Sequence, residues 1–381
     1  MSSPPAPPSP VAPHAPVGAD ASAAFWRTLL GASVSAPPPA AAGDLAILAD
    51  RLCRRVAPGW AASLLAPLAA ASGLALVAPG PARQSALFSS LARAAQIGAL
   101  KRLTDAGLRP VAMKGFAAAH LLYPEPTPRI VGDLDVLIER ARLRDAIALF
   151  AADGFAFGGA RERRWGFVSD ASFLPFHGPD GVCNIDFHVE PDAWPLHAGL
   201  PAAAVRDAAR EVAAGGARFL APADEHVVLI AVSNIAKDRF AWQTLSKAID
   251  LSRLLRRSTA TLDWDEIAAR ANAARLEKAL AATLTLLADL GLDAVAIPPA
   301  VARRPTGMAG ATYARVLADW RQMFPSDPGG GAMLWREATL AHRPSTALRL
   351  NARRLRGLLS PGDGVPPEAR GLIPTTPDPA G

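Results

Sequence analysis

The sequence contains very little cysteine. Only Cys53 and Cys183 occur among 381 residues, far apart and without a C-x-x-C motif or a Cys/His cluster. This composition excludes a disulfide-stapled scaffold and gives no indication of a zinc site. Such thiol usage is typical of a reducing compartment, so we expect a cytoplasmic protein.

Long uninterrupted apolar segments are also scarce. Residues 1–24 have neither a basic start nor an apolar core, and they predict a disordered Pro/Ala-rich tail instead of a signal peptide. The charge-free run 56–82 is the candidate membrane span, but Pro58, Pro67 and Gly73 interrupt it. Its pieces are shorter than the ~20 residues that a span needs, so we expect no transmembrane segment.

Arginine, by contrast, is abundant. The formal net charge is +6 and the sequence pI is about 9.9, with arginine supplying nearly all the positive charge. Guanidinium groups favour phosphate-bearing ligands, which is one interpretation. A GC-rich genome, which inflates Ala, Arg, Gly and Pro together, is the other. Half of the residues are hydrophobic, enough for one large domain or two modest ones.

The pattern along the chain predicts distinct regions after the tail. Residues 25–107 have helical periodicity, residues 108–220 alternate short apolar runs with helices, and residues 221–300 are helical again. Residues 301–381 are Pro/Gly-rich and are expected to be partly disordered. They include a basic helix at 343–359, which fits either a solvated amphipathic helix or a contact with a membrane surface or acidic partner.

Two acids stand inside one of the apolar runs. The segment IVGDLDVLI predicts a strand at 130–138, in which Asp133 and Asp135 project to the same face. Close carboxylates resist burial unless a cation lies between them, and hard oxygen ligands suit Mg²⁺ or Mn²⁺. A Pro-Asp-Gly turn predicts a hairpin whose second strand carries Asp186. If that strand neighbours the first, Asp186 completes a three-acid site.

The acid pair alone is a weak motif. Chance yields about three acid-x-acid pairs in such a chain, and three occur, the others being Glu190/Asp192 and Asp263/Asp265. The last has helix-capping spacing with Glu266, and Glu190/Asp192 fits a loop. A wet polar hairpin face is therefore the alternative to a metal site.

Further candidates surround the acids. His188 shares the face of Asp186 and, with Glu190, is a candidate ligand or supporting group. Lys114 and Gly115 lie where a short strand becomes a helix, a position that suits phosphate oxygens but also an ordinary turn. Arg129 fits a second phosphate contact or a surface arginine.

Together these residues resemble a known family. The order K-G at 114–115, a helix ending L-Y-P, Arg129, D-x-D at 133–135 and I-D-F-H at 185–188 is similar to the polymerase-β-type nucleotidyltransferase superfamily. Within it, the chain resembles the bacterial group of uncharacterised nucleotidyltransferases over about residues 45–295. The resemblance implies an α+β fold: a small mixed β-sheet core flanked by helices, with an N-terminal helical segment and a C-terminal helical domain.

The resemblance also implies a reaction. Asp133, Asp135 and Asp186 match the acids that hold two Mg²⁺ ions, and Asp186 matches the acid that can accept the acceptor's proton. An NTP, with ATP the first candidate, would give its NMP to a hydroxyl of a small molecule or protein and release pyrophosphate. Lys114 and Gly115 replace the Gly-Ser turn of better-known relatives.

Two other functions remain open. The missing serine and the basic C-terminal helix fit a non-catalytic nucleotide- or partner-binding module, and metal-dependent phosphodiester hydrolysis uses similar acids. Dispersed basic residues without interleaved aromatic ones disfavour nucleic acid as a partner.

Overall fold

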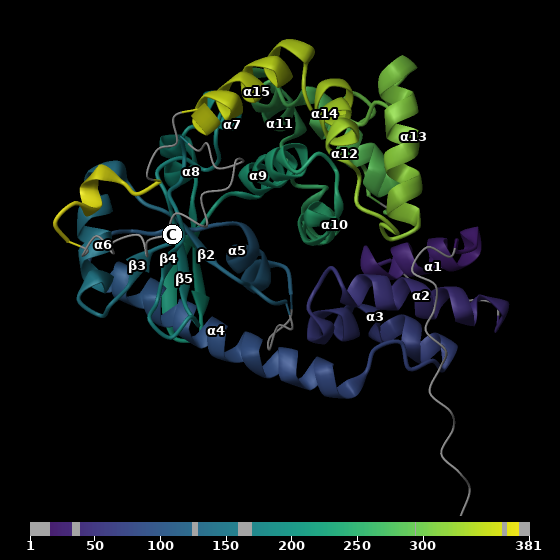
Figure 1. The fold of residues 1–381 in the computed structure, drawn as a ribbon, viewed down its shortest axis with the longest axis horizontal. Helices are drawn as coiled ribbons and strands as arrows, with labels where there is room; N and C mark the ends of the chain where they lie inside the picture. Colours follow the sequence, from purple (N-terminus) through teal and green to yellow (C-terminus); the bar gives the residue numbers. More distant parts are fainter. Residues whose placement is uncertain are drawn as a thin grey trace, which may run out of the picture.

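The computed structural model describes residues 16–32, 39–123, 129–158, 170–293, 295–359 and 364–372. A mixed seven-stranded sheet lies at one end and is flanked by helices (Figure 1), which confirms the predicted α+β fold. The strands run in the order β3-β4-β5-β2-β1-β7-β6. Their bounds are β1 Val111–Ala112, β2 Leu134–Leu137, β3 Ala156–Phe157, β4 Phe176–His177, β5 Asn184–His188, β6 Arg210–Ala214 and β7 Ala217–Ala221.

Strand alternation gives the central strands one apolar face and one polar face. Leu134 and Val136 of β2 pack in the core cluster beneath helices α4 (Pro79–Asp105) and α6 (Leu143–Ala151). The intervening Asp135 therefore projects from the opposite face, toward the helices that follow the sheet in sequence. Strand β5 repeats the pattern, with Ile185 and Phe187 in the same core cluster.

Helices before the sheet form a separate group joined to it by the long helix α4 (Figure 1). They are α1 (Ala19–Leu29), α2 (Ala42–Cys53) and α3 (Pro58–Ser72). The expectation of a disordered tail through residue 24 is wrong from Ala19 onward. Helix α1 is ordered because Phe25 and Trp26 are buried and the Trp26 indole donates a 2.9 Å hydrogen bond to the carbonyl of Trp320.

Residues 221–300 are helical, as their periodicity predicts. Helices also occupy residues 307–321 and 330–336, where the Pro/Gly-rich sequence predicted only one basic helix and partial disorder. The second half of the chain is thus helical. Its helices are α9 (Asp224–Lys237), α10 (Leu245–Ser258), α11 (Trp264–Ala273), α12 (Glu277–Asp289), α13 (Gly307–Arg321), α14 (Gly330–Arg336) and α15 (Pro344–Leu359). Asp263 caps α11 by accepting a hydrogen bond from the Glu266 amide, as expected. Among the described residues, no helix combines the length and the apolar character needed to cross a membrane.

Several strands differ from the expectation. Strand β2 begins at Leu134, so Asp133 lies just before it and not within it. The hairpin of β4 and β5 is confirmed around Pro179-Asp180-Gly181, although residues 159–169, part of its expected first strand, lie outside the described residues. Sequence patterns missed the hairpin of β6 and β7. Its strands are short and partly exposed, so they show little apolar periodicity, and Gly215-Gly216 forms its turn.

Candidate active site

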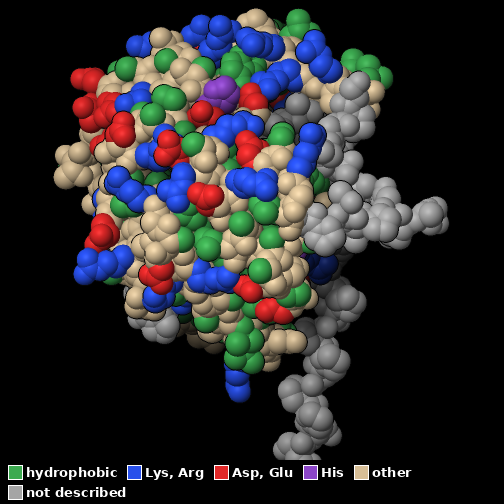
Figure 2. Space-filling model, turned by 90° about the vertical axis from the view of Figure 1, so that its left-hand side faces the viewer, with side chains coloured by type: hydrophobic (Ala, Val, Ile, Leu, Met, Phe, Trp, Pro, Cys, Tyr) green, Lys and Arg blue, Asp and Glu red, His purple; other side chains and the backbone are tan. Residues whose placement is uncertain are grey.

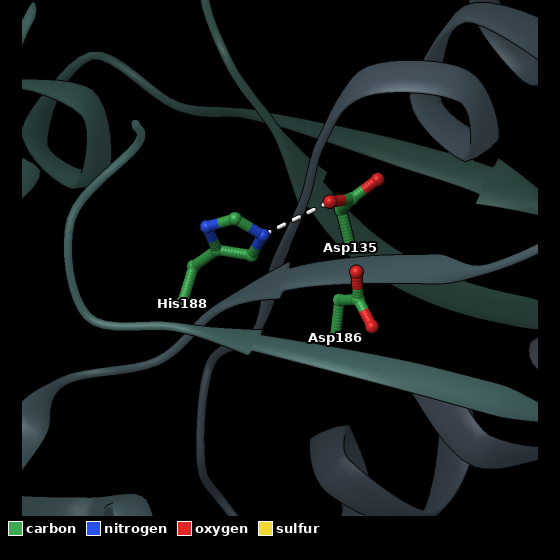
Figure 3. A group of neighbouring side chains, drawn as sticks. All are labelled: Asp135, Asp186 and His188. Carbon is green, nitrogen blue, oxygen red and sulfur yellow. Dashed lines mark hydrogen bonds and ion pairs between the residues drawn. The ribbon is translucent and has the colours of Figure 1, made fainter. Parts of the chain in front are cut away.

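Asp135 and Asp186 face each other across two neighbouring strands. Strands β2 and β5 are parallel, and their register places Asp135 directly opposite Asp186. The strand that carries Asp186 is thus the neighbour of the strand that carries Asp135, as the predicted site requires. His188, two residues beyond Asp186, completes a cluster whose ligand atoms all lie within 4.8 Å of one another (Figure 3).

Asp186 carries an unsatisfied oxygen. Its Oδ1 is buried and has no hydrogen-bond partner among the described residues. Burial, followed by the negative charges of Asp135 and Asp133, raises the pKa of Asp186 to about 7. A buried acceptor without a donor is costly, and a bound cation or a proton is the ordinary remedy.

Asp135 is the most enclosed of the acids and already has partners. It is 4% exposed, and its Oδ1 lies 2.6 Å from Lys114 Nζ and 2.9 Å from His188 Nε2. Burial opposes its ionisation, but the Lys114 charge and the His188 hydrogen bond outweigh burial and lower the pKa of Asp135. It is therefore a carboxylate at neutral pH.

Asp133 occupies a different environment. It is exposed and precedes β2, and it is not a member of the 4.8 Å cluster. The charge of Asp135, followed by loss of hydration where the carboxyl lines the pocket, raises the pKa of Asp133. Asp133 nevertheless lines the same pocket as Asp135 and Asp186, so the three acids open onto one space.

The strand-to-helix junction brings Lys114 to the acids. Helix α5 (Lys114–Leu121) begins directly after β1, and Lys114 itself has φ of 48°. Its Nζ lies 2.6 Å from Asp135 Oδ1 and 3.3 Å from His188 Nε2. Burial disfavours the charged lysine, but the charges of Asp135, Asp192 and Asp186 outweigh burial and raise its pKa. Gly115 lines the pocket beside it.

The guanidinium of Arg129 is engaged by another acid. It forms a two-pronged contact with Asp250 of α10, Nε to Oδ1 at 3.1 Å and Nη2 to Oδ2 at 2.9 Å. Its Cζ lies 4.3 Å from the ring centroid of Trp60. Arg129 lines the pocket, but the expected phosphate contact would compete with Asp250 for the same guanidinium edge.

A pocket of about 370 Å³ opens over these side chains. The acids, Lys114, Gly115 and Arg129 form one wall, and helices α9 and α10 form the other. The helical wall carries apolar side chains, together with Asp224, Asn234, Ser246, Lys247 and Asp250. Ligand sites commonly combine such an apolar wall with a few convergent polar groups.

Comparison with known proteins identifies the family of this chain. Residues 81–291, more than half of the chain, match the family described as uncharacterised nucleotidyltransferase. The chain belongs to this family. No curated protein and no solved structure matches it.

The nucleotidyltransferase is thus a transferase of phosphorus-containing groups, and its family implies an NTP substrate and a divalent metal. The site fits such an ion. Two carboxylates and an imidazole offer ligand atoms within 4.8 Å, and Asp186 Oδ1 is unpartnered among the described residues. Burial, followed by the Lys114 charge, lowers the pKa of His188, so its ring is neutral at physiological pH, the form that can ligate a metal.

The structure separates His188 from Glu190. His188 contacts Asp135 directly, whereas Glu190 lies beyond β5 and its Oε2 accepts a 2.7 Å hydrogen bond from the amide of Ala202, at the start of helix α8 (Ala202–Asp207). Glu190 therefore caps a helix of the nucleotidyltransferase. The expected supporting role fits His188 by position.

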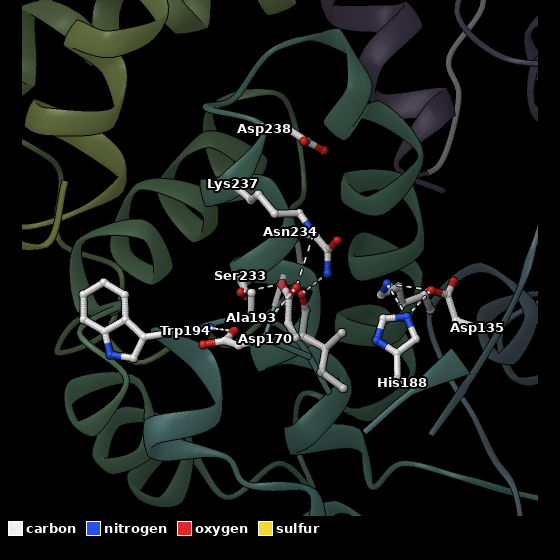
Figure 4. A network of polar contacts seen from close by, with 12 residues as sticks. Asp135, Asp170, His188, Ala193, Trp194, Ser233, Asn234, Lys237 and Asp238 are labelled. Atoms are coloured by element: carbon white, nitrogen blue, oxygen red, sulfur yellow. Dashed lines mark hydrogen bonds and ion pairs between the residues drawn. The ribbon is translucent and has the colours of Figure 1, made fainter. Parts of the chain in front are cut away.

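Asp192 lies in a loop after β5, as its sequence position predicts, and it belongs to the polar network around the site. It is 4% exposed and accepts hydrogen bonds from Ser233 at 2.8 Å and Lys237 at 3.3 Å. Figure 4 shows Ser233 and Lys237 in this polar network. Burial opposes its ionisation, but Lys237 and then Lys114 lower the pKa of Asp192 to about 2. Ser233 and Lys237 lie four residues apart on α9, a spacing that places both side chains on the helix face toward Asp192.

Proposed function

We propose that the protein transfers an NMP from an NTP, with ATP the first candidate, to a hydroxyl group of a small molecule or protein, with Mg²⁺ or Mn²⁺ as cofactor. The observation that supports this proposal is the register of Asp135 opposite Asp186, with an unpartnered Asp186 oxygen at a pocket. Distant, free Cys53 and Cys183 fit a cytoplasmic location, which is part of the proposal.

The acids would hold the metal. Asp133, Asp135 and Asp186 all line the pocket, and we assign them as ligands, with His188 holding Asp135 in place. Carboxylate oxygens are the ligands that Mg²⁺ prefers. When bound, the ion would neutralise phosphate charge and make the acceptor hydroxyl a better nucleophile.

The chain's own groups orient the reactants and move the proton. The acceptor oxygen forms a bond to the α-phosphorus, the bond from the α-phosphorus to its bridging oxygen breaks, and pyrophosphate leaves with that electron pair. We assign Asp186 as the group that accepts the acceptor's proton. Its Oδ1 has no hydrogen-bond partner among the described residues, so an oxygen is available to receive that proton.

The nucleotide would lie along the pocket. We propose that the triphosphate approaches the start of α5 at Gly115, where unpaired backbone N–H groups of a helix attract anions. The apolar wall of α9 and α10 then remains for the base or the acceptor. Arg129 is assigned a positioning role through Asp250 in place of a direct phosphate contact.

Nucleic acid is not the proposed acceptor. On the face shown in Figure 2, lysine and arginine side chains lie among acidic and apolar ones, apart from a group along its top edge. Proteins that follow a nucleic-acid backbone instead present a continuous basic groove with aromatic platforms. A small molecule or a protein side chain fits the enclosed pocket better.

The test is transfer of label from each NTP, labelled at the α-phosphate, into a lysate of the source cells with Mg²⁺, followed by identification of the product by mass. We expect Asp133→Asn combined with Asp135→Asn to reduce labelling at least ~100-fold, because charge neutralisation at the phosphates is lost. Circular dichroism should show an intact fold.

The matched control changes a second pair of the same motif. Asp263→Asn with Asp265→Asn lies at the start of α11, and asparagine also caps helices, so labelling should persist. Equal labelling by wild type and the Asp133/Asp135 variant contradicts the proposal. Binding of NTP without any turnover identifies a binding module, and hydrolysis without incorporation identifies a phosphodiesterase.

A further inference from the structure

Lys114 occupies the position of a cation in the acidic site. Its Nζ lies 2.6 Å from Asp135 Oδ1 and 3.3 Å from His188 Nε2, and the same Asp135 oxygen lies 2.9 Å from that nitrogen. Asp135 and His188 are two of the three members of the cluster able to hold a metal. The Lys114 ammonium therefore lies beside two atoms, Asp135 Oδ1 and His188 Nε2, that could themselves bind a metal ion.

The ion pair of Lys114 and Asp135 is largely buried. The side chains of Lys114 and Asp135 are 20% and 5% exposed, so water screens their attraction weakly. Lys114 also has φ of 48°, a left-handed backbone conformation that is uncommon for a residue other than glycine. A non-glycine residue persists in this conformation where surrounding contacts hold it, and the Asp135 contact is one of them.

The remaining charge suits one divalent ion. Asp133, Asp135 and Asp186 contribute three negative charges when ionised, and Lys114 contributes one positive charge, which leaves a charge of −2 on these four residues. Arg129, on the same wall, is balanced by Asp250. Asp192 does not add to the deficit, because Lys237 lies 3.3 Å from it. A single divalent cation brings the wall to neutrality, and a second one gives it net positive charge.

Free ligand atoms point to the same conclusion. Both hydrogen bonds of the Asp135 carboxylate use Oδ1, so among the described residues Oδ2 has no partner. Asp186 Oδ1 is likewise unpartnered in the described part of the chain. Asp135 Oδ2 and Asp186 Oδ1 therefore remain available to one ion. The Lys114 ammonium occupies the space beside Asp135 Oδ1 and His188.

We infer that Lys114 serves as a permanent cation of this site and replaces one of the two divalent ions that the superfamily resemblance implies. The protein itself then holds one divalent ion, between Asp186 and Oδ2 of Asp135, with Asp133 lining the same pocket. This inference rests on the proposed function and revises both the expected metal count and the expected phosphate contact from Lys114.

The test counts Mn²⁺ ions on the full-length protein without nucleotide, by the loss of the electron paramagnetic resonance signal of free Mn²⁺ during titration. We expect one ion per chain for wild type and two for Lys114→Met, which opens the position on Asp135 and His188. Lys114→Arg keeps the charge and should bind one.

A matched control removes another lysine from the same pocket. Lys247 lines the pocket, but its ammonium pairs with Asp238 and not with the three acids, so Lys247→Met should still bind one ion. If Lys114 had only a structural role, the Lys114→Met substitution would not add a metal-binding site. Thermal unfolding checks that each variant is folded.

Two ions on wild type, or one on a folded Lys114→Met, overturn the inference. The wild-type count decides even if Lys114→Met does not fold. These outcomes differ from failure of the proposed function. If wild type binds two ions and transfers nucleotide, only the role of Lys114 is wrong, whereas absence of Mn²⁺ binding together with absence of transfer removes the proposed function and the inference that rests on it.

Discussion

At the scale of single residues, Asp186 differs from Asp135 in lacking a counter-charge within hydrogen-bond distance. Asp135 has Lys114 and His188 within hydrogen-bond distance, whereas Asp186 Oδ1 is buried without a partner among the described residues. One carboxylate is thus permanently charged, and the other is poised between protonated and charged forms. This division of roles supports its assignment as metal ligand and proton acceptor.

The raised pKa of Asp186 predicts a pH-dependent cost to stability in the metal-free protein. Its folded pKa of about 7 exceeds the ~3.9 of an unfolded aspartate, so the folded state holds the proton more tightly. The stabilisation is complete below about pH 4 and is lost as the pH rises toward 7. With chelator present, we expect Asp186→Asn to be about 1–3 kcal/mol more stable than wild type at pH 8.

Thermal unfolding at pH 5 and pH 8 measures this difference. The advantage of Asp186→Asn should shrink at pH 5, and added Mg²⁺ should reverse the order at pH 8 by binding the ionised wild-type carboxylate. An advantage that is the same at both pH values, or a less stable variant at pH 8, contradicts the assigned environment of Asp186.

At the scale of elements, helix α10 is tied to the site by one buried ion pair. Asp250 receives Arg129 through two hydrogen bonds and also accepts a 2.7 Å hydrogen bond from the Tyr123 hydroxyl. The side chains of Arg129 and Asp250 are 9% and 12% exposed. Because α10 forms part of the helical wall, this pair sets the position of that wall relative to the acids.

Removal of Asp250 should be costly. Asp250→Ala leaves the buried Arg129 guanidinium without the Asp250 carboxylate, and breaking a buried ion pair costs about 3–5 kcal/mol in comparable cases. The control Asp50→Ala breaks an exposed Asp–Arg pair with Arg54, whose side chains are 57% and 68% exposed, and should cost at most about 1 kcal/mol. Denaturant unfolding compares the two, and equal costs would show that Asp250 does not carry the contact.

Some elements were predictable from sequence, and others were not. The alternation of Leu134, Asp135 and Val136 predicted β2, and the Pro-Asp-Gly turn predicted the hairpin that carries Asp186. Helix α1 and the β6–β7 hairpin were missed, because α1 is stabilised by Trp320, 294 residues away from Trp26, and the hairpin has no clear apolar period.

The site shows the same division. The membership of Asp135 and Asp186 followed from local strand patterns, since both lie on predicted strands. The partner of Arg129 lies 121 residues away on another element, and the partner of Asp192 lies 41 residues away. Such contacts depend on how elements pack, which no local pattern records. The family resemblance supplied the reaction class, which spacing alone did not.

At the scale of the whole molecule, the sheet packs against helices that lie outside residues 108–220. Ala99, Leu100 and Leu103 of α4 form one core with the strands, and Val111, Met113 and Leu137 belong to the core of the helical regions. The expected division at residues 108–220 therefore cuts through both cores.

A fragment of residues 108–220 should not fold alone. It lacks α4 on one sheet face and α9 and α10 on the other, which exposes the apolar side chains of both faces. A heteronuclear NMR spectrum of the fragment should show the narrow amide dispersion of an unfolded chain, and the full-length protein should give a dispersed spectrum. A dispersed fragment spectrum would show that the catalytic region is an autonomous domain.

The central claim is that this site transfers a nucleotidyl group, and the fate of label from two positions of ATP tests it most directly. The purified protein, Mg²⁺ and source-cell lysate are incubated with ATP labelled at the α-phosphate or at the γ-phosphate. We predict that α-label enters the acceptor and γ-label appears in pyrophosphate, both dependent on Asp133 and Asp135. Entry of γ-label into the acceptor, or α-label entry that survives loss of both acids, would contradict the account.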